Sequence, residues 1–242
     1  MTRRRLVDDL FDRFYPKSEG YGDATIRFHR LCHDNIPRGA SILEIGAGPA
    51  NETTSELATI GTVTAVDVSD EVLDNPDVAK ATVYDGGRLP FADEEFDACV
   101  SNYVLEHVTD PDTHFAEVAR VLKRGGIYVI RTPNLLHYVA SASYLMPHAL
   151  HLAIANRLRA LPEGSHDPWP TVYRANRPPV LKRLARRAGL APIHFSTVEC
   201  EPSYAKGSAV LFFPMMLYER AVNSTDLLSP FRASITAVFR KA

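Results

Sequence analysis

The chain has few cysteines, little net charge and no long hydrophobic run. Cys32, Cys99 and Cys200 are far apart and form no Cys-x-x-Cys pair, which argues against a disulfide framework and a cysteine zinc site. The formal net charge is -2 over 242 residues, so nothing indicates the basic face that nucleic acids need. The strongly apolar run at 209–218 contains Pro214 and falls short of the ~20 residues that span a bilayer. We therefore expect a reduced cytoplasmic protein without a metal, a nucleic-acid partner or a transmembrane segment.

Length and composition are those of one enzyme-sized domain. Hydrophobic residues make up 45% and charged residues 23%, which is ordinary for a globular protein. Apolar spacing predicts helices over 5–15 and 24–35. From residue 41 strand and helix patterns alternate, which gives a parallel sheet with right-handed crossovers. The predicted strands of this part are 41–45, 62–66, 80–84, 98–101 and 127–131, and its predicted helices lie at about 51–60, from 70, and at about 112–122.

Two strand ends predict a site for a nucleoside cofactor. Residues 42–48 read Ile-Leu-Glu-Ile-Gly-Ala-Gly, an apolar run that stops in a glycine turn. Residues 65–68 read Ala-Val-Asp-Val, a second apolar run that stops at a carboxylate. In adjacent parallel strands, the first end gives a loop that a ligand can approach, and Asp67 gives an acceptor for sugar hydroxyls.

These and later motifs resemble the class I S-adenosylmethionine-dependent methyltransferases, in particular the type 11 group that acts on small molecules. The first motif reads Glu44-x-Gly46-x-Gly48-x-Ala50, with alanine in place of the third glycine. The segment 122–126, Leu-Lys-Arg-Gly-Gly, has Arg124 where the family has proline. Further matching segments are Asp-Gly-Gly-Arg-Leu-Pro-Phe at 85–91, Phe-Asp-Ala-Cys-Val at 96–100 and Leu-Glu-His-Val at 105–108.

The resemblance implies S-adenosylmethionine as the cofactor and S-adenosylhomocysteine as the product. It implies that Glu44 faces the cofactor ammonium, that Asp67 accepts from the ribose and that Asp85 accepts from the adenine amino group. Plainer interpretations stay open, namely a loop-capping role for Glu44 and turn roles for Asp67 and Asp85. The implied cofactor-binding residues are Glu44, Gly46, Ala47, Gly48, Asp67, Val68, Asp85, Gly86, Asn102 and Tyr103.

After Pro133 the pattern predicts a helix from about 178, a strand at 193–200, a helix within 207–223 and a strand at 234–239. By the resemblance the last strand is antiparallel. The predicted fold class is therefore α/β, a Rossmann-like, mainly parallel seven-stranded sheet with helices on both faces and helical insertions after strands five and six. We predict a single domain over 1–242, made of N-terminal helices (1–40), a cofactor-binding core (41–134) and insertions (134–175 and 203–231), the first of them a substrate lid.

The base that would take a proton from the acceptor is the least defined part of the site. His107 follows strand four, His137 follows strand five, and His166 lies in the first insertion beside Asp167. Histidine titrates near neutrality, so each is a candidate base, although each also has an ordinary structural or surface interpretation. Catalysis by proximity alone, without a base, is a further alternative.

The acceptor class is narrowed by a missing motif. The Asp/Asn-Pro-Pro-Tyr signature of amino methyltransferases should follow strand four, where residues 101–104 read Ser-Asn-Tyr-Val. This favours a small-molecule acceptor with an oxygen nucleophile, and a carbon or nitrogen nucleophile stays open. The aromatic residues of both insertions suit an aromatic, lipidic, polyketide or sugar-containing acceptor, or they pack the insertions or form a homodimer interface.

Two rival functions stay open from the sequence. One is an NAD(P)-dependent oxidoreductase, which the position of Glu44 and the absence of a Tyr-x-x-x-Lys pair disfavour. The other is a member of the fold that binds S-adenosylmethionine but is non-methylating or repurposed.

Overall fold

The computed structural model describes residues 3–16, 24–145, 170–202, 205–206 and 208–242. Contacts within the chain group it into two units. We call 25–133, 171–196 and 234–242 the sheet unit, and 1–24, 134–170 and 197–233 the helical unit. The single domain with a lid stays a prediction, since most of the first insertion lies outside the described residues.

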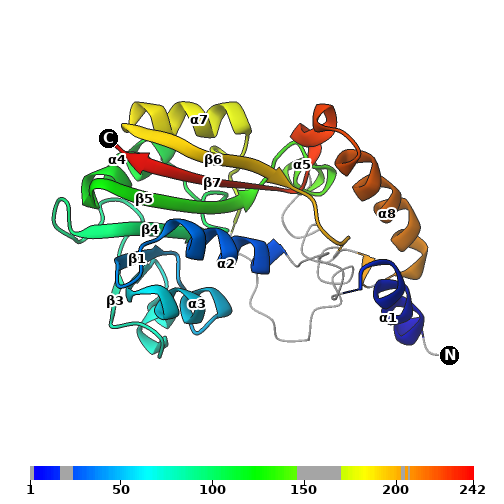
Figure 1. The fold of residues 1–242 in the computed structure, drawn as a ribbon, viewed down its shortest axis with the longest axis horizontal. Coiled ribbons are helices and arrows are strands. Elements are labelled where there is room, and N and C mark those ends of the chain that lie inside the picture. The colour runs from blue at the N-terminus through cyan, green and yellow to red at the C-terminus, as the bar shows by residue number, and fades with distance from the viewer. Residues whose placement is uncertain (1–2, 17–23, 146–169, 203–204, 207) are drawn as a thin grey trace. The chain divides into compact units, whose positions relative to one another are not determined.

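The sheet unit is built on seven strands in the order β3-β2-β1-β4-β5-β7-β6 (Figure 1). Strands β1 to β5 pair in parallel, and β7 runs antiparallel to β5. This confirms the predicted fold class. The strands are β1 (Ser41–Ile45), β2 (Thr62–Asp67), β3 (Lys80–Val83), β4 (Phe96–Asn102), β5 (Leu122–Pro133), β6 (Leu190–Val198) and β7 (Ser234–Lys241).

Helices cover both faces of this sheet (Figure 1). One face packs against α2 (Ala24–Asn35) and α3 (Glu52–Ile60), and Phe28 is fully buried there. The other face packs against α4 (Pro111–Val121) and α7 (Pro178–Arg187). Because side chains alternate along a strand, neighbouring residues of β1 serve different cores: Ile42 packs with α2 and α3, and Leu43 with α4 and α7.

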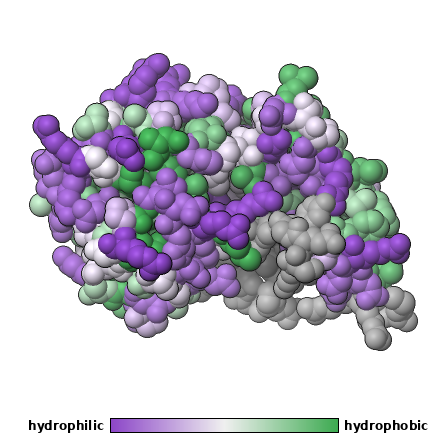
Figure 2. All heavy atoms as spheres, in the orientation of Figure 1, coloured by the Kyte–Doolittle hydropathy of each residue, from purple (hydrophilic) through white to green (hydrophobic). Residues whose placement is uncertain are grey.

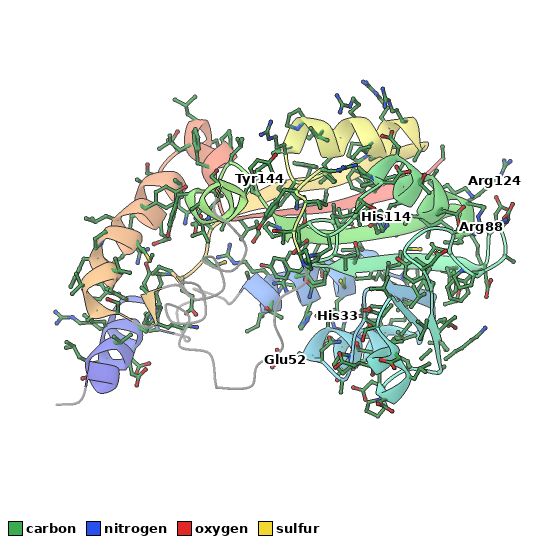
Figure 3. All side chains as sticks on the ribbon, turned by 180° about the vertical axis from the view of Figure 1, so that it is seen from behind. His33, Glu52, Arg88, His114, Arg124 and Tyr144 are labelled. Atoms are coloured by element: carbon green, nitrogen blue, oxygen red, sulfur yellow. The ribbon has the colours of Figure 1, made fainter. Side chains whose placement is uncertain are left out.

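The first crossover shows how local sequence sets the position of the site. Asn51 caps α3 as expected, because its Oδ1 accepts hydrogen bonds from the backbone N–H groups of Thr53 (2.8 Å) and Thr54 (3.0 Å). Figure 3 shows Glu52 on the first turn of α3. The helix therefore starts directly after the glycine turn, and its first residues lie beside the carboxyl end of β1. The 3₁₀ helix η2 (Asp70–Asp74) follows β2 in the same way.

Strands β5 and β6 differ most in extent from the sequence prediction. Strand β5 begins at Leu122 rather than 127, because Leu122 pairs with Phe96 before a register shift in β4. Strand β6 begins at Leu190, because Gly189, with φ 75°, ends the α7 segment and lets the chain extend at once.

The helical unit contains α1 (Arg3–Phe14), α5 (Tyr138–Leu145), α8 (Ala209–Asn223) and the 3₁₀ helix η4 (Asp226–Phe231). The α1 and α8 segments pack through aromatic rings, with the Phe11 and Phe212 centroids 5.1 Å apart. No helix of the described residues is long and apolar enough to cross a membrane. The face seen in Figure 2 carries mostly hydrophilic residues with smaller hydrophobic groups between them.

Candidate functional site

The glycine turn after β1 contains two glycines with different surroundings. Gly46 has φ 71° and Gly48 has φ 58°, the left-handed region that favours glycine. A Cβ on Gly46 would clash with the side chain of Val104, so this glycine also has a packing role. A Cβ on Gly48 would meet nothing within 4 Å, so the backbone there borders open space. Ala50 is not among the described residues with positive φ, so it takes the third glycine position without left-handed strain.

Asp67 joins the glycine turn to the end of β2. Its carboxylate accepts from the backbone N–H of Gly48 at 2.8 Å through Oδ2 and from that of Ser69 at 2.9 Å through Oδ1. The second bond forms the turn that was the plainer interpretation of this residue. Each carboxylate oxygen accepts more than one hydrogen bond, so Asp67 keeps acceptor capacity for a ligand hydroxyl.

Glu44 is a buried carboxylate without enough partners. Its side chain is 3% exposed, and Oε2 has no hydrogen-bond partner. Burial raises the pKa of Glu44 to about 7, a hydrogen bond with Thr54 opposes the rise, and the negative charge of Asp67 adds to it. A buried acceptor of this kind needs a donor, and a ligand ammonium or a bridging water supplies one.

The ends of β2 and β3 bring Val68 and Gly86 together. A Cβ on Gly86 would lie 3.6 Å from Val68 Cγ1, and Val68 is 45% exposed. The exposed Asp85 accepts from the backbone N–H of Gly87 at 2.9 Å, so its turn role is present and its adenine role stays a prediction. Ala47 packs against Ala65, which gives it a place in the core.

Asn102 and Tyr103 are held by Arg131, which the sequence analysis missed. The Asn102 side chain donates to Thr53 Oγ1 at 3.0 Å and accepts from Arg131 Nε at 2.7 Å. Tyr103 has φ 58° and donates its backbone N–H to the Arg131 carbonyl at 2.8 Å. Arg131 directly follows the apolar run 127–130 of β5 and is 3% exposed, so the rule that flagged Glu44 in the sequence would have flagged it too.

The candidate bases lie in different surroundings. His107 belongs to the sheet unit, and its Nε2 lies 4.0 Å from Glu106 Oε1. Glu106 is 5% exposed and accepts from Thr132 Oγ1 at 3.1 Å, and burial raises its pKa to about 7. The pair therefore combines an imidazole that is partly exposed with a carboxyl that titrates near neutrality.

His137 belongs to the helical unit and is buried there. Its Nε2 lies 3.5 Å from Glu199 Oε2 without a hydrogen bond. Burial lowers the pKa of His137 to about 4 and raises that of Glu199 to about 8, which favours a neutral imidazole beside a neutral acid at pH 7. His166 lies outside the described residues. Among the described residues, no group of three or more His, Cys, Asp or Glu is placed to hold a metal ion.

Comparison with known proteins shows similarity to methyltransferases over part of the chain. Residues 43–130 match the model of the methyltransferase domain Methyltransf_11. The chain is 30% identical over 169 residues to the ubiquinone biosynthesis O-methyltransferase of Thiobacillus denitrificans, covering 63% of this chain and 65% of that protein. It is 34% identical over 149 residues to the demethylmenaquinone methyltransferase of Corynebacterium glutamicum (strain R), covering 53% of this chain and 64% of that protein.

These similarities support a class I S-adenosylmethionine-dependent methyltransferase domain over residues 43–130. The chain spans less than two thirds of each of these two relatives. The fold similarity extends further, since the solved structure of the [4+2]-cyclase SpnF has a TM-score of 0.59 at 18% identity and covers 99% of this chain and 96% of that one. The similarity to that cyclase shows a shared fold and carries no inference about activity.

The residues present fit the cofactor of this methyltransferase family. The open edge at Gly48 admits a ligand to the backbone, and Asp67 offers further acceptor capacity. Among the described residues, Glu44 Oε2 is a buried acceptor without a donor. It therefore fits a ligand that brings an ammonium group, and this observation supports the cofactor independently of the fold. The match of residues 43–130 to a methyltransferase domain also favours S-adenosylmethionine over the NAD(P) alternative.

Proposed function

We propose that this chain binds S-adenosylmethionine and transfers its methyl group to an oxygen nucleophile of a small molecule. The acceptor class is an aromatic, lipidic, polyketide or sugar-containing metabolite, and the product of the cofactor is S-adenosylhomocysteine. The observation that carries the proposal is the buried Glu44 carboxylate, whose Oε2 lacks a donor directly before an open glycine turn.

When bound, the cofactor supplies a methyl group already activated on a sulfonium. The chain must then hold the cofactor, align the acceptor, exclude water and accept one proton. In the proposal Glu44 accepts from the cofactor ammonium, Asp67 from the ribose hydroxyls and Asp85 from the adenine amino group. Gly48 and Gly86 keep these approaches free of side chains.

The named relatives suggest which acceptor to test first. One is named for O-methylation in ubiquinone biosynthesis and the other for methylation of demethylmenaquinone. A hydroxylated quinol ring is therefore the first acceptor class, and it lies within the aromatic acceptors that the sequence favours. The lack of an Asp/Asn-Pro-Pro-Tyr motif after β4 supports an acceptor other than a nucleic-acid base.

We assign the proton acceptor to His107, with Glu106 as its partner. A general base works best when its pKa lies near the working pH. Burial lowers the pKa of His137 to about 4, which makes it a weak base, whereas His107 is partly exposed and stands beside a carboxyl. The Glu106 carboxylate would stabilise the imidazolium that forms when His107 takes the acceptor proton.

The test measures methyl transfer and S-adenosylhomocysteine binding for the wild type, His107→Ala and His137→Ala. We expect His107→Ala to lose about 10²- to 10⁴-fold in kcat while ligand affinity changes little. His137→Ala is the matched control and should keep kcat within a few-fold. A kcat for His107→Ala equal to that of the wild type would remove the histidine from the mechanism. Tight cofactor binding with no transfer to a panel of quinols and phenols would favour the repurposed alternative.

A further inference from the structure

Two buried charges of opposite sign lie at one edge of the sheet. Glu44 pairs with Val100 across β1 and β4, and Asn102 pairs with Arg131 across β4 and β5. Val100 and Val129 pack against the α2 and α3 side, and side chains two residues apart share a face. Glu44, Asn102 and Arg131 therefore share this face, with Asn102 and Arg131 in register and Glu44 two residues before them, and we call these three residues the charged row.

The hydrogen-bond partners and ring neighbours of the Arg131 guanidinium are neutral, although its charge also reaches the buried Glu106 carboxyl and opposes the rise in the pKa of Glu106. Besides the bond to Asn102, its Nη1 donates to Thr25 Oγ1 at 3.2 Å. The guanidinium lies 5.0 Å from the ring centroid of Phe28 and 4.6 Å from that of Tyr103. Among the described residues no carboxylate lies within ion-pair distance of Arg131. Nη2 has no hydrogen bond to any described residue.

The two charges do not neutralise each other. Strand β4 lies between β1 and β5, and adjacent strands are ~4.8 Å apart, so β1 and β5 are roughly 10 Å apart, and the two-residue offset of Glu44 separates the two residues further. The Asn102 side chain, bonded to Thr53, lies between them. The Cys32 thiol of α2 feels both groups, because Glu44 raises its pKa and Arg131 lowers it.

Burying an unpaired charge costs free energy unless a partner arrives with the ligand. Among the described residues, the charged row has an anion with an oxygen that lacks a donor and a cation that lacks an ion-pair partner, and such an arrangement is complementary to a zwitterion. The cofactor ends in such a group, an ammonium and a carboxylate on the same carbon. A guanidinium fork is well suited to a carboxylate because it offers two parallel N–H donors.

We propose that Arg131 binds the α-carboxylate of the cofactor, opposite the ammonium at Glu44. This inference rests on the proposed function and deepens it. It names Arg131 as the residue that distinguishes the intact cofactor from a nucleoside that lacks the amino-acid end. Arg131 is also bonded to Asn102 and to the backbone of Tyr103. In the proposal, a ligand bound at the charged row therefore also fixes Asn102, the last residue of β4, and Tyr103 after it.

The test uses calorimetric titration with two ligands, S-adenosylhomocysteine and 5′-methylthioadenosine, which keeps the nucleoside and sulfur but lacks the aminocarboxylate. We expect Arg131→Gln to weaken S-adenosylhomocysteine binding about 10- to 100-fold and to change methylthioadenosine binding less than about threefold. Arg240→Gln is the matched control. It removes an exposed arginine paired with Ile127, well before Arg131 along β5, and should change neither affinity.

Equal losses for both ligands in Arg131→Gln, or no loss for S-adenosylhomocysteine, would overturn the assignment. If Arg131→Gln fails to fold, the wild type alone decides by comparison with decarboxylated S-adenosylhomocysteine, which keeps the amine and lacks the carboxylate. Binding at least about tenfold weaker is expected, and equal binding contradicts the inference. A wild type that binds neither S-adenosylhomocysteine nor methylthioadenosine overturns the proposed function itself, which is a separate result.

Discussion

The two faces of the sheet bury polar groups in contrasting ways. On the α4 and α7 side, the Tyr128 hydroxyl is bonded to Ser101 Oγ at 2.8 Å and to His114 Nε2 at 2.9 Å. Burial lowers the pKa of His114 to about 4, so this tyrosine cluster, Ser101, Tyr128 and His114, is neutral at pH 7. Figure 3 shows His114 beside the sheet. On the α2 and α3 side, the charged row holds an orphaned anion and a cation without a counter-ion.

This contrast indicates that the tyrosine cluster stabilises the fold, whereas the charged row binds a ligand. Neutral polar groups bonded to one another stabilise a core or leave it unaffected. Charged groups without partners lower the stability of the free protein and persist where a ligand completes them. We therefore expect changes in the tyrosine cluster to alter only the free energy of unfolding. We expect the charged row to lower the stability of the free protein and to strengthen ligand binding.

Glu44→Gln should have the largest effect among the substitutions that test the contrast between the two faces. The pKa of Glu44 is raised from 4.5 to about 7 on folding, so the folded chain keeps a proton that the unfolded chain releases between these values. Stability of the free protein therefore falls as pH rises from about 4.5 to 7, and glutamine abolishes this fall. We expect Glu44→Gln to be more stable by about 2–3 kcal/mol at pH 8, with little gain at pH 4.5.

Denaturant unfolding at both pH values measures this gain, and calorimetry should show S-adenosylhomocysteine binding weakened by ~1–2 kcal/mol. Glu56→Gln on α3, whose side chain is 46% exposed, is the matched control and should change neither quantity. A Glu44→Gln protein that is less stable than the wild type at pH 8 would show that the buried carboxylate has a structural partner.

Asp67→Ala tests the second anionic group of the site. It removes the acceptor assigned to the ribose and two bonds to backbone N–H groups. We expect S-adenosylhomocysteine binding to weaken by ~1–3 kcal/mol, measured by calorimetry. Asp112→Ala, which removes a carboxylate that is 62% exposed, should leave the affinity unchanged. Wild-type affinity in Asp67→Ala would refute the ribose role.

Tyr128→Phe tests the opposite face and should have the smallest effect. Loss of the hydroxyl leaves Ser101 and His114 without their shared partner, which costs about 1–2 kcal/mol of unfolding free energy. Because the cluster lies on the other face of the sheet, S-adenosylhomocysteine affinity should equal that of the wild type. Denaturant unfolding and calorimetry measure the two quantities, and a clear loss of affinity would contradict the division between the faces.

The sequence predicted the framework because its signals are local. Asn51 caps α3 and Gly189 ends the α7 segment, and each effect depends on neighbouring residues alone. The alternation of apolar strands and helices was enough to predict a mainly parallel sheet, the antiparallel β7 being added by resemblance. The helix over Ala24–Asn35 was predicted at its observed bounds for the same reason.

The charged row could not be predicted in full because it depends on register. Arg131 lies beside Asn102 only through the pairing of β5 with β4, and Phe28 reaches it from α2. The second role of Gly46 likewise depends on Val104, which is remote in sequence. Pairing between distant segments is set by the whole sheet, so a single sequence indicates that a charge needs a partner without indicating which one.

Calorimetric titration of the wild-type protein with S-adenosylhomocysteine, with NADH as the control, tests the central claim most directly. The account predicts binding in the micromolar range for S-adenosylhomocysteine and none for NADH. Absence of S-adenosylhomocysteine binding, or binding of NADH in its place, would contradict the assignment of this site and with it the proposed methyl transfer.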